Sequence, residues 1–104
     1  MVYIFLAEGF EEIEALTPAD ILRRAGVEVA LAGVGGLEIT GAHGIRVSCD
    51  VTSADAAAAA ESAAGVQMII LPGGMPGADN LFASDDVRRA IEGAKESGAF
   101  IGAI

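Results

Sequence analysis

Carboxylates and glycines follow two apolar segments of this sequence, in positions that would suit proton transfer. The pair Gly73-Gly74 follows the apolar run Met68–Leu71. The carboxylates follow the first apolar run and are Glu8, Glu11, Glu12 and Glu14. A carboxyl group can hold and transfer a proton, and glycine leaves its backbone N–H open to close approach. If the fold brings the two segments together, the carboxylates and the bare backbone of the two glycines share one crevice.

The elements that must position these residues alternate between strand and helix. Short, continuously apolar runs predict strands buried on both faces of a parallel sheet, and they cover residues 2–6, 27–32, 68–71 and 100–104. Helical spacing and capping signals predict helices between the strands, over residues 11–24, 53–64 and 85–97. Ser84 is the expected N-cap of the last helix, and Gly26, Gly65 and Gly98 are expected to end the three helices.

Pro18 interrupts the first predicted helix and leaves two structures open. In one, Thr17 caps a second helix that has Pro18 at its first position. In the other, a single helix continues with a kink, because the Pro18 ring clashes with the carbonyl of Glu14.

Two short alternating stretches, residues 37–40 and 45–49, predict an antiparallel ribbon at the margin of the sheet. The ribbon turns around residues 41–44, and we interpret His43 there as a turn residue. Residues 75–83 are expected to form a loop.

Composition excludes several classes of protein. A net charge of −9 with six Lys and Arg argues against nucleic acid and against an acidic membrane surface. Cys49 is the single cysteine and His43 the single histidine, which excludes an internal disulfide and leaves too few ligands for zinc. Neither a dinucleotide loop nor a phosphate loop occurs, so no cofactor is expected. Without a bilayer-spanning run or a secretory leader, a cytoplasmic protein is expected.

The connections between strands are long enough for right-handed crossovers, which predicts a three-layer α/β sandwich with a mainly parallel, flavodoxin-like sheet. The strand at residues 2–6 is then central, and the loops after residues 6, 71 and 104 converge on one crevice. The strand at 100–104 is left with a bare edge, which soluble proteins avoid. We therefore expect residues 1–104 to form a single partial domain whose sheet a carboxyl-terminal segment completes.

Four motifs, in this order, carry a resemblance to a known family: EEIEA at residues 11–15, RRAGVEV at 23–29, IILPGG at 69–74 and IGAI at 101–104. Together they resemble the ThiJ/PfpI family of the class I glutamine amidotransferase-like superfamily, especially the branch of the human parkinsonism-associated protein. The resemblance covers the whole chain and about the amino-terminal half of a family domain.

The resemblance implies a reactive cysteine directly after Ile104, a position that this chain does not contain. It also implies that Glu14 is the acidic partner of this thiol and that the amides of Gly73 and Gly74 bind the oxyanion. The implied activity is that of a glyoxalase or deglycase that converts small 2-oxoaldehydes such as methylglyoxal into hydroxy acids. The implied alternatives are an oxidative-stress sensor or chaperone without turnover, and an intracellular cysteine peptidase.

Other residues have plainer interpretations. The first turn of a helix favours an ionised Glu14, so burial beside a thiolate must outweigh it for Glu14 to donate a proton. We expect Glu11 and Glu12 to be solvated helix acids, and Glu8 is a lesser candidate for the catalytic acid. The resemblance implies a homodimer that makes contact near Ile13, Arg24 and Cys49. Cys49 itself is expected either as a small hydrophobic residue or as a redox-active thiol.

Overall fold

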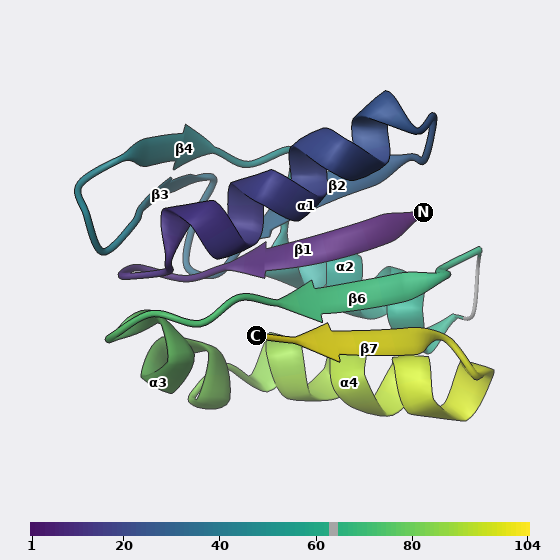
Figure 1. Cartoon of the computed structure of the whole chain (residues 1–104). Coiled ribbons are helices and arrows are strands. Elements are labelled where there is room, and N and C mark those ends of the chain that lie inside the picture. Colours follow the sequence, from purple (N-terminus) through teal and green to yellow (C-terminus); the bar gives the residue numbers. More distant parts are fainter. Residues whose placement is uncertain (63–64) are drawn as a thin grey trace.

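The computed structural model describes residues 1–62 and 65–104 and contains a five-stranded sheet (Figure 1). Its strands are β1 (Val2–Leu6), β2 (Val29–Gly33), β5 (Val51–Thr52), β6 (Met68–Leu71) and β7 (Phe100–Ala103). Their order across the sheet is β5-β2-β1-β6-β7, and all adjacent pairs are parallel. The predicted flavodoxin-like arrangement with a central first strand is confirmed.

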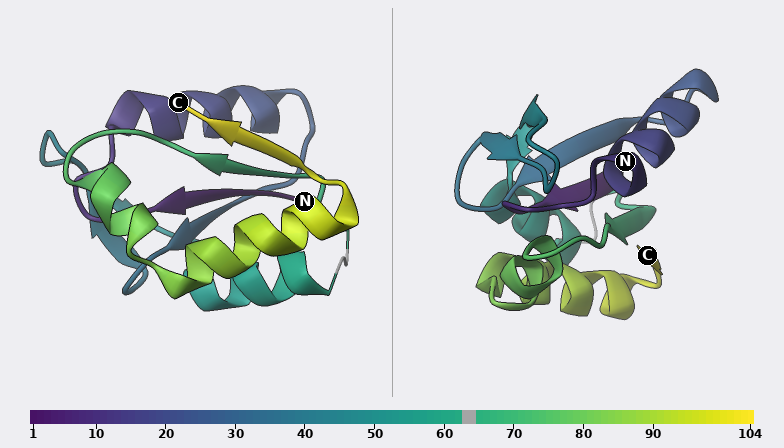
Figure 2. Two further views of the ribbon diagram at one scale, coloured as in Figure 1. Left: turned by 90° about the horizontal axis from the view of Figure 1, so that it is seen from below. Right: turned by 60° about the vertical axis from the view of Figure 1, so that its left-hand side comes forward.

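Helices cover both faces of the sheet (Figures 1 and 2). They are α1 (Glu12–Arg24), α2 (Ser53–Glu61), α3 (Gly77–Phe82) and α4 (Asp85–Ser97). One face carries α1 and a separate antiparallel pair of strands, β3 (Glu38–Thr40) and β4 (Arg46–Ser48). The other face carries α2, α3 and α4. These are the three layers that the alternation of strands and helices predicts.

The central strand supplies side chains to both halves of the core. Ile4 and Leu6 pack on the side of α1, while Phe5 points to the opposite side and packs among the alanines of α2 and α4. Burial of one such side chain stabilises the fold by about 1.5–3 kcal/mol. The small residues bring the helices close, because a Cβ at Gly93 would lie 2.7 Å from the carbonyl oxygen of Ala60. α2 and α4 therefore pack closely against each other on this face of the sheet.

α1 continues through Pro18 as one helix, so the alternative in which Thr17 caps a second helix is wrong. Pro18 removes the hydrogen bond that an N–H there would donate to the carbonyl of Glu14. Ala15 and Ala19 on the same helix are buried in the core on this side of the sheet, and this packing offsets the loss.

Several elements differ from their prediction. The ribbon of β3 and β4 is a separate sheet, and the main sheet has β5 and β7 at its margins; the two residues of β5 are too few for a sequence pattern. β2 is shifted toward Gly33. α3 lies inside the predicted loop; it has six residues and no side-chain cap, so it lacks the usual helix signals. α2 ends at Glu61, and the rest of the predicted helix, residues 63–64, lies outside the described residues.

The described helices include none with both the length and the apolar character that crossing a bilayer requires.

Candidate active site

The loops that follow β1, β6 and β7 lie at the same end of the sheet, beyond the carboxyl ends of the strands. The three strands are parallel, so their carboxyl ends point the same way (Figure 1). The ladder extends by one residue beyond β7, because the Ile104 N–H donates to the carbonyl of Leu71 at 3.1 Å. This is the convergence expected from the topology.

Glu14 contacts the diglycine loop directly. Its Oε1 accepts a hydrogen bond from the Gly73 N–H at 2.8 Å. The Glu11 N–H donates to the carbonyl of Gly73, also at 2.8 Å. The amino end of α1 thus binds both backbone polar groups of Gly73.

Gly73 has no room for a side chain. A Cβ at this residue would lie 2.7 Å from Glu14 Oε1 and 2.9 Å from the carbonyl oxygen of Ile104. The Glu14 carboxylate and the end of β7 therefore flank the same glycine, and the structure brings these three predicted elements together. Gly74 is equally constrained, with φ of +100° and a Cβ position 2.5 Å from the Glu11 nitrogen.

The two amides predicted to bind an oxyanion are not equivalent. The Gly73 N–H is occupied by Glu14. The Gly74 N–H donates to no acceptor within the described residues. For the Gly73 amide, an oxyanion would have to compete with the Glu14 carboxylate.

Two hollows lie near Glu14 and Gly73, where the sequence predicts a single crevice. One has a volume of about 590 Å³ and is mainly apolar; Gly73 and Ile104 line it together with residues of α3 and α4. The other, of about 550 Å³, lies on the side of α1 and is lined by Glu11, Glu12, Glu14 and His43, among others. Glu14 thus lines the second hollow, and Gly73, whose N–H it binds, lines the first.

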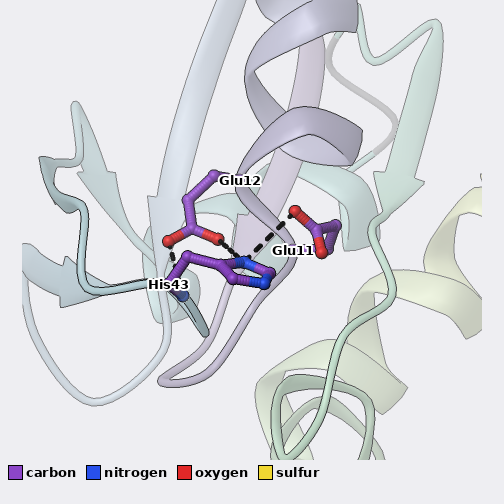
Figure 3. A group of neighbouring side chains, drawn as sticks. All are labelled: Glu11, Glu12 and His43. Carbon is purple, nitrogen blue, oxygen red and sulfur yellow. Dashed lines mark hydrogen bonds and ion pairs between the residues drawn. The ribbon is translucent and has the colours of Figure 1, made fainter.

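Glu12 is not the solvated acid that we expected. It is only 4% exposed, and its carboxylate binds the tip of the β3–β4 hairpin (Figure 3). Glu12 Oε2 accepts from the backbone N–H groups of His43 at 2.8 Å and Ile45 at 3.2 Å. Burial alone would raise the pKa of Glu12, but these bonds and one with the His43 side chain lower it to about 2. Glu12 is therefore a buried carboxylate that stays ionised.

His43 does more than occupy a turn, which corrects our interpretation of it. Its Nδ1 lies 3.0 Å from Glu12 Oε1 and 3.6 Å from Glu11 Oε1 (Figure 3). The hydrogen bond with Glu12 and the charges of both carboxylates raise the pKa of His43. One sequence signal pointed to Glu12, because Glu12, Ala15 and Ala19 have the spacing of a single buried helix face. No local pattern pairs His43 with a residue 31 positions away.

Glu11, Glu12 and His43 form the one group within residues 1–62 and 65–104 whose potential ligand atoms lie close enough for a metal ion, all within 4.8 Å of one another. Both oxygens of Glu12 already accept hydrogen bonds, including two from backbone amides. The hydrogen bonds thus explain this cluster without a metal.

The remaining predicted residues take no part in the contact between Glu14 and Gly73. Ile13 is 72% exposed, and Arg24 forms an exposed ion pair with Asp20 at 3.0 Å. Glu8 accepts a hydrogen bond from the Thr40 N–H at 3.3 Å. Cys49 packs in the core as a small hydrophobic residue, and burial, assisted by two nearby carboxylates, raises its pKa to about 11. A thiol in this state is a poor nucleophile and a poor redox centre.

Proteins of known families match this sequence along almost its whole length. Residues 1–104 match the DJ-1/PfpI family along their whole length. The chain is 33% identical over 102 residues to the Parkinson disease protein 7 homolog of Danio rerio, covering 97% of this chain and 52% of the relative. Protein dj-1beta of Drosophila melanogaster matches with the same identity and coverage. The chain therefore spans about half the length of these relatives.

Solved structures agree with the sequence comparison. The oxidized DJ-1 of Toxoplasma gondii superposes with a TM-score of 0.88 at 31% identity, over 98% of this chain and 53% of that one. The DJ-1beta structure from Drosophila melanogaster superposes with a TM-score of 0.88 at 29% identity, with the same coverage. This protein therefore belongs to the DJ-1/PfpI family.

Proposed function

We propose that the intact protein converts small 2-oxoaldehydes such as methylglyoxal into hydroxy acids through a covalent thiol adduct. Glu14 moves protons in this reaction, and the amides of Gly73 and Gly74 bind the negative oxygen. The nucleophile is a cysteine thiol next to Ile104, supplied by the part of the protein that follows residue 104.

One observation carries the proposal: Glu14, Gly73 and Ile104 lie against one another. Glu14 Oε1 accepts from the Gly73 N–H at 2.8 Å, and a Cβ at Gly73 would touch both Glu14 and the Ile104 carbonyl. A thiol on the residue after Ile104 would emerge beside this carboxylate and the glycine amides. Nucleophile, proton carrier and oxyanion donors are the three parts that such a reaction needs.

The chemistry balances without a cofactor. The thiolate attacks the aldehyde carbon, a C–S bond forms and the oxygen takes a proton, which gives a hemithioacetal. Glu14 moves the proton of this carbon to the neighbouring carbonyl carbon, while the hydroxyl proton of the hemithioacetal passes to the neighbouring carbonyl oxygen; the result is a hydroxyacyl thioester. Water then cleaves the C–S bond, which releases the hydroxy acid and restores the thiol. The oxidation at one carbon equals the reduction at the next.

We also propose that a carboxyl-terminal segment covers β7 and completes the sheet. β7 is the edge strand, and it exposes Phe100 (75%), Ile101 (44%) and, just beyond it, Ile104 (65%). Large apolar side chains around an unpaired edge favour further pairing.

A homodimer in a reducing, cytoplasmic setting completes the proposal. The exposed Ile13 and Ile21 lie two turns apart on α1, with Arg24 three residues further along. This helix face offers apolar contact area for a second copy. Cys49 would lie behind this contact rather than in it, since it is buried.

An oxidation sensor is the second candidate, favoured by a structural relative that was solved in an oxidized form. In that function the thiol becomes a sulfinate, and Glu14 holds it by a hydrogen bond. The protein would then respond to peroxide without turning over an aldehyde.

Turnover separates the two candidates. The full-length protein is incubated with methylglyoxal, and lactate formation is measured for the wild type, Glu14→Gln and the control Glu28→Gln. Glu28 lies at the amino ends of the strands, away from the diglycine loop, where its carbonyl accepts from the Val2 N–H. The enzyme hypothesis expects lactate from the wild type and from Glu28→Gln. Peroxide-dependent sulfinate without lactate in any variant would favour the sensor.

A further inference from the structure

We propose that Glu12 and His43 are positioning residues: they fasten the tip of the β3–β4 hairpin to the first turn of α1 and thereby hold Glu14 against the Gly73 loop. The inference rests on the proposed function for its catalytic meaning. Its structural content stands on contacts alone.

The first turn of α1 lies between two partners. A helix turns by about 100° per residue, so Glu12 and Glu14 point in nearly opposite directions. Glu12 binds the hairpin and Glu14 binds the Gly73 amide. Motion of this turn must therefore change both contacts.

Further bonds join the hairpin to the segment before α1. The Ala42 N–H donates to the carbonyl of Phe10 at 2.8 Å, and the Gly9 N–H donates to the carbonyl of Thr40 at 2.9 Å. Glu12 is the side chain that closes this connection, because its carboxyl group fills the space where a Cβ of Gly41 would lie. The hairpin thus contacts one side of the first turn of α1, which carries Glu14.

The diglycine loop contacts the opposite side of this turn. The Glu11 N–H bonds the Gly73 carbonyl, and the Gly73 N–H bonds Glu14. If the hairpin detaches from Glu12, the turn loses one of its two supports. Glu14 is then free to leave the position from which it would serve a thiol next to Ile104.

The charges around His43 give the fastening a dependence on pH. Glu11, the N-cap of α1, and Glu12 in its first turn lie within 3.6 Å of the imidazole Nδ1. Glu8 binds the hairpin at Thr40, and Arg46 belongs to β4. Protonated His43 adds an ionic attraction to the hydrogen bond with Glu12. The imidazole is largely exposed, so solvent screens this attraction and the effect is modest.

The test is amide hydrogen exchange by NMR on the full-length protein, expressed as protection factors. Glu12→Gln should lower protection at His43 and Ile45 by about tenfold, because a neutral amide oxygen replaces the ionised oxygen that accepts from both amides. Protection at Gly73, which Glu12 does not touch, should fall as well. Glu38→Gln is the matched control, since Glu38 lies on the same hairpin and bonds Ser48 instead of α1; it should leave Gly73 protected.

Two additional variants keep the proposal falsifiable if Glu12→Gln does not fold. Gly41→Ala pushes the Glu12 carboxyl group aside without changing a charge, and it should reproduce the loss at Gly73. In the wild type, Gly73 protection should decrease as His43 deprotonates, and this step should vanish in His43→Gln. Loss of protection at His43 and Ile45 without any change at Gly73 would overturn the proposal. The measurement needs no turnover, so a protein without glyoxalase activity would refute the proposed function and leave this inference standing.

Discussion

Glu12 and Glu14 lie two residues apart on the same helix turn, and the fold treats them differently. Glu12 is 4% exposed, and both of its oxygens are bound by the hairpin. Glu14 is only partly buried, and within the described residues one of its oxygens accepts one hydrogen bond. A fully bound carboxylate has little capacity left for chemistry, whereas a carboxylate with a free oxygen can still exchange a proton. The difference separates a structural acid from a catalytic candidate.

The largest expected effect is that substitution of Glu14 lowers activity, whereas substitution of Glu12 lowers stability. Glu14→Gln should lower kcat for methylglyoxal by about 10²–10⁴-fold, because the proton carrier is gone. Its unfolding midpoint should stay near that of the wild type, since glutamine retains an oxygen for the Gly73 amide. Glu12→Gln should instead lower the unfolding midpoint. Lactate assays and thermal melts of the two variants measure this, and equal loss of activity with equal loss of stability in both would remove the distinction.

A second prediction concerns the space around Gly73. Gly73→Ala places a methyl group against Glu14 and Ile104, and we expect a loss of stability of about 1–3 kcal/mol together with a loss of turnover. Gly36→Ala is the matched control, because nothing lies within 4 Å of its Cβ position. Its stability should change by no more than about 0.5 kcal/mol in urea denaturation. An active and stable Gly73→Ala protein would show that the contact between the three segments is unimportant.

A third prediction follows from the pKa values of the Glu12–His43 pair. The lowered pKa of Glu12 stabilises the fold above about pH 4.5, and this contribution disappears as the pH falls toward about 2. The raised pKa of His43 stabilises the fold below about pH 6.5, and this contribution disappears as the pH rises through the folded-state value. The pair should contribute most between these limits.

Urea denaturation at several pH values tests this window. The difference in stability between the wild type and His43→Gln should be largest near pH 5.5 and should shrink toward alkaline pH. A difference that grows above pH 8 would contradict the assignment.

The smallest effect on function is expected for substitution of Cys49. This residue shows what burial does to a pKa when no hydrogen-bond donors offset it. Burial raises the pKa of Cys49 from 9.0 to about 11, whereas Glu12 is buried among donors and its pKa is lowered. At pH 7.5, iodoacetamide should modify Cys49 about a hundredfold more slowly in the folded than in the unfolded protein, by mass spectrometry. Cys49→Ala should turn over methylglyoxal like the wild type; rapid modification in the folded state would contradict the burial argument.

Local signals predicted most of the fold. Apolar runs located β1, β6 and β7, and Ser84 and Gly98 marked the two ends of α4 as observed. The elements that were missed, β5 and α3, have two and six residues. Such short segments are held by the neighbours against which they pack, and their own sequence carries little of that information.

The sequence by itself determined the alternation of strands and helices, and with it the placing of Glu14 and Gly73-Gly74 at the carboxyl ends of neighbouring strands. This is possible because hydrophobic periodicity and capping act over a few residues. Only the tertiary structure decided that Glu12 is buried and bound by the hairpin, whereas Glu14 is only partly buried. The partner of Glu12 lies 31 residues away on a hairpin, and hydrogen bonds between segments so far apart form only when the chain has folded.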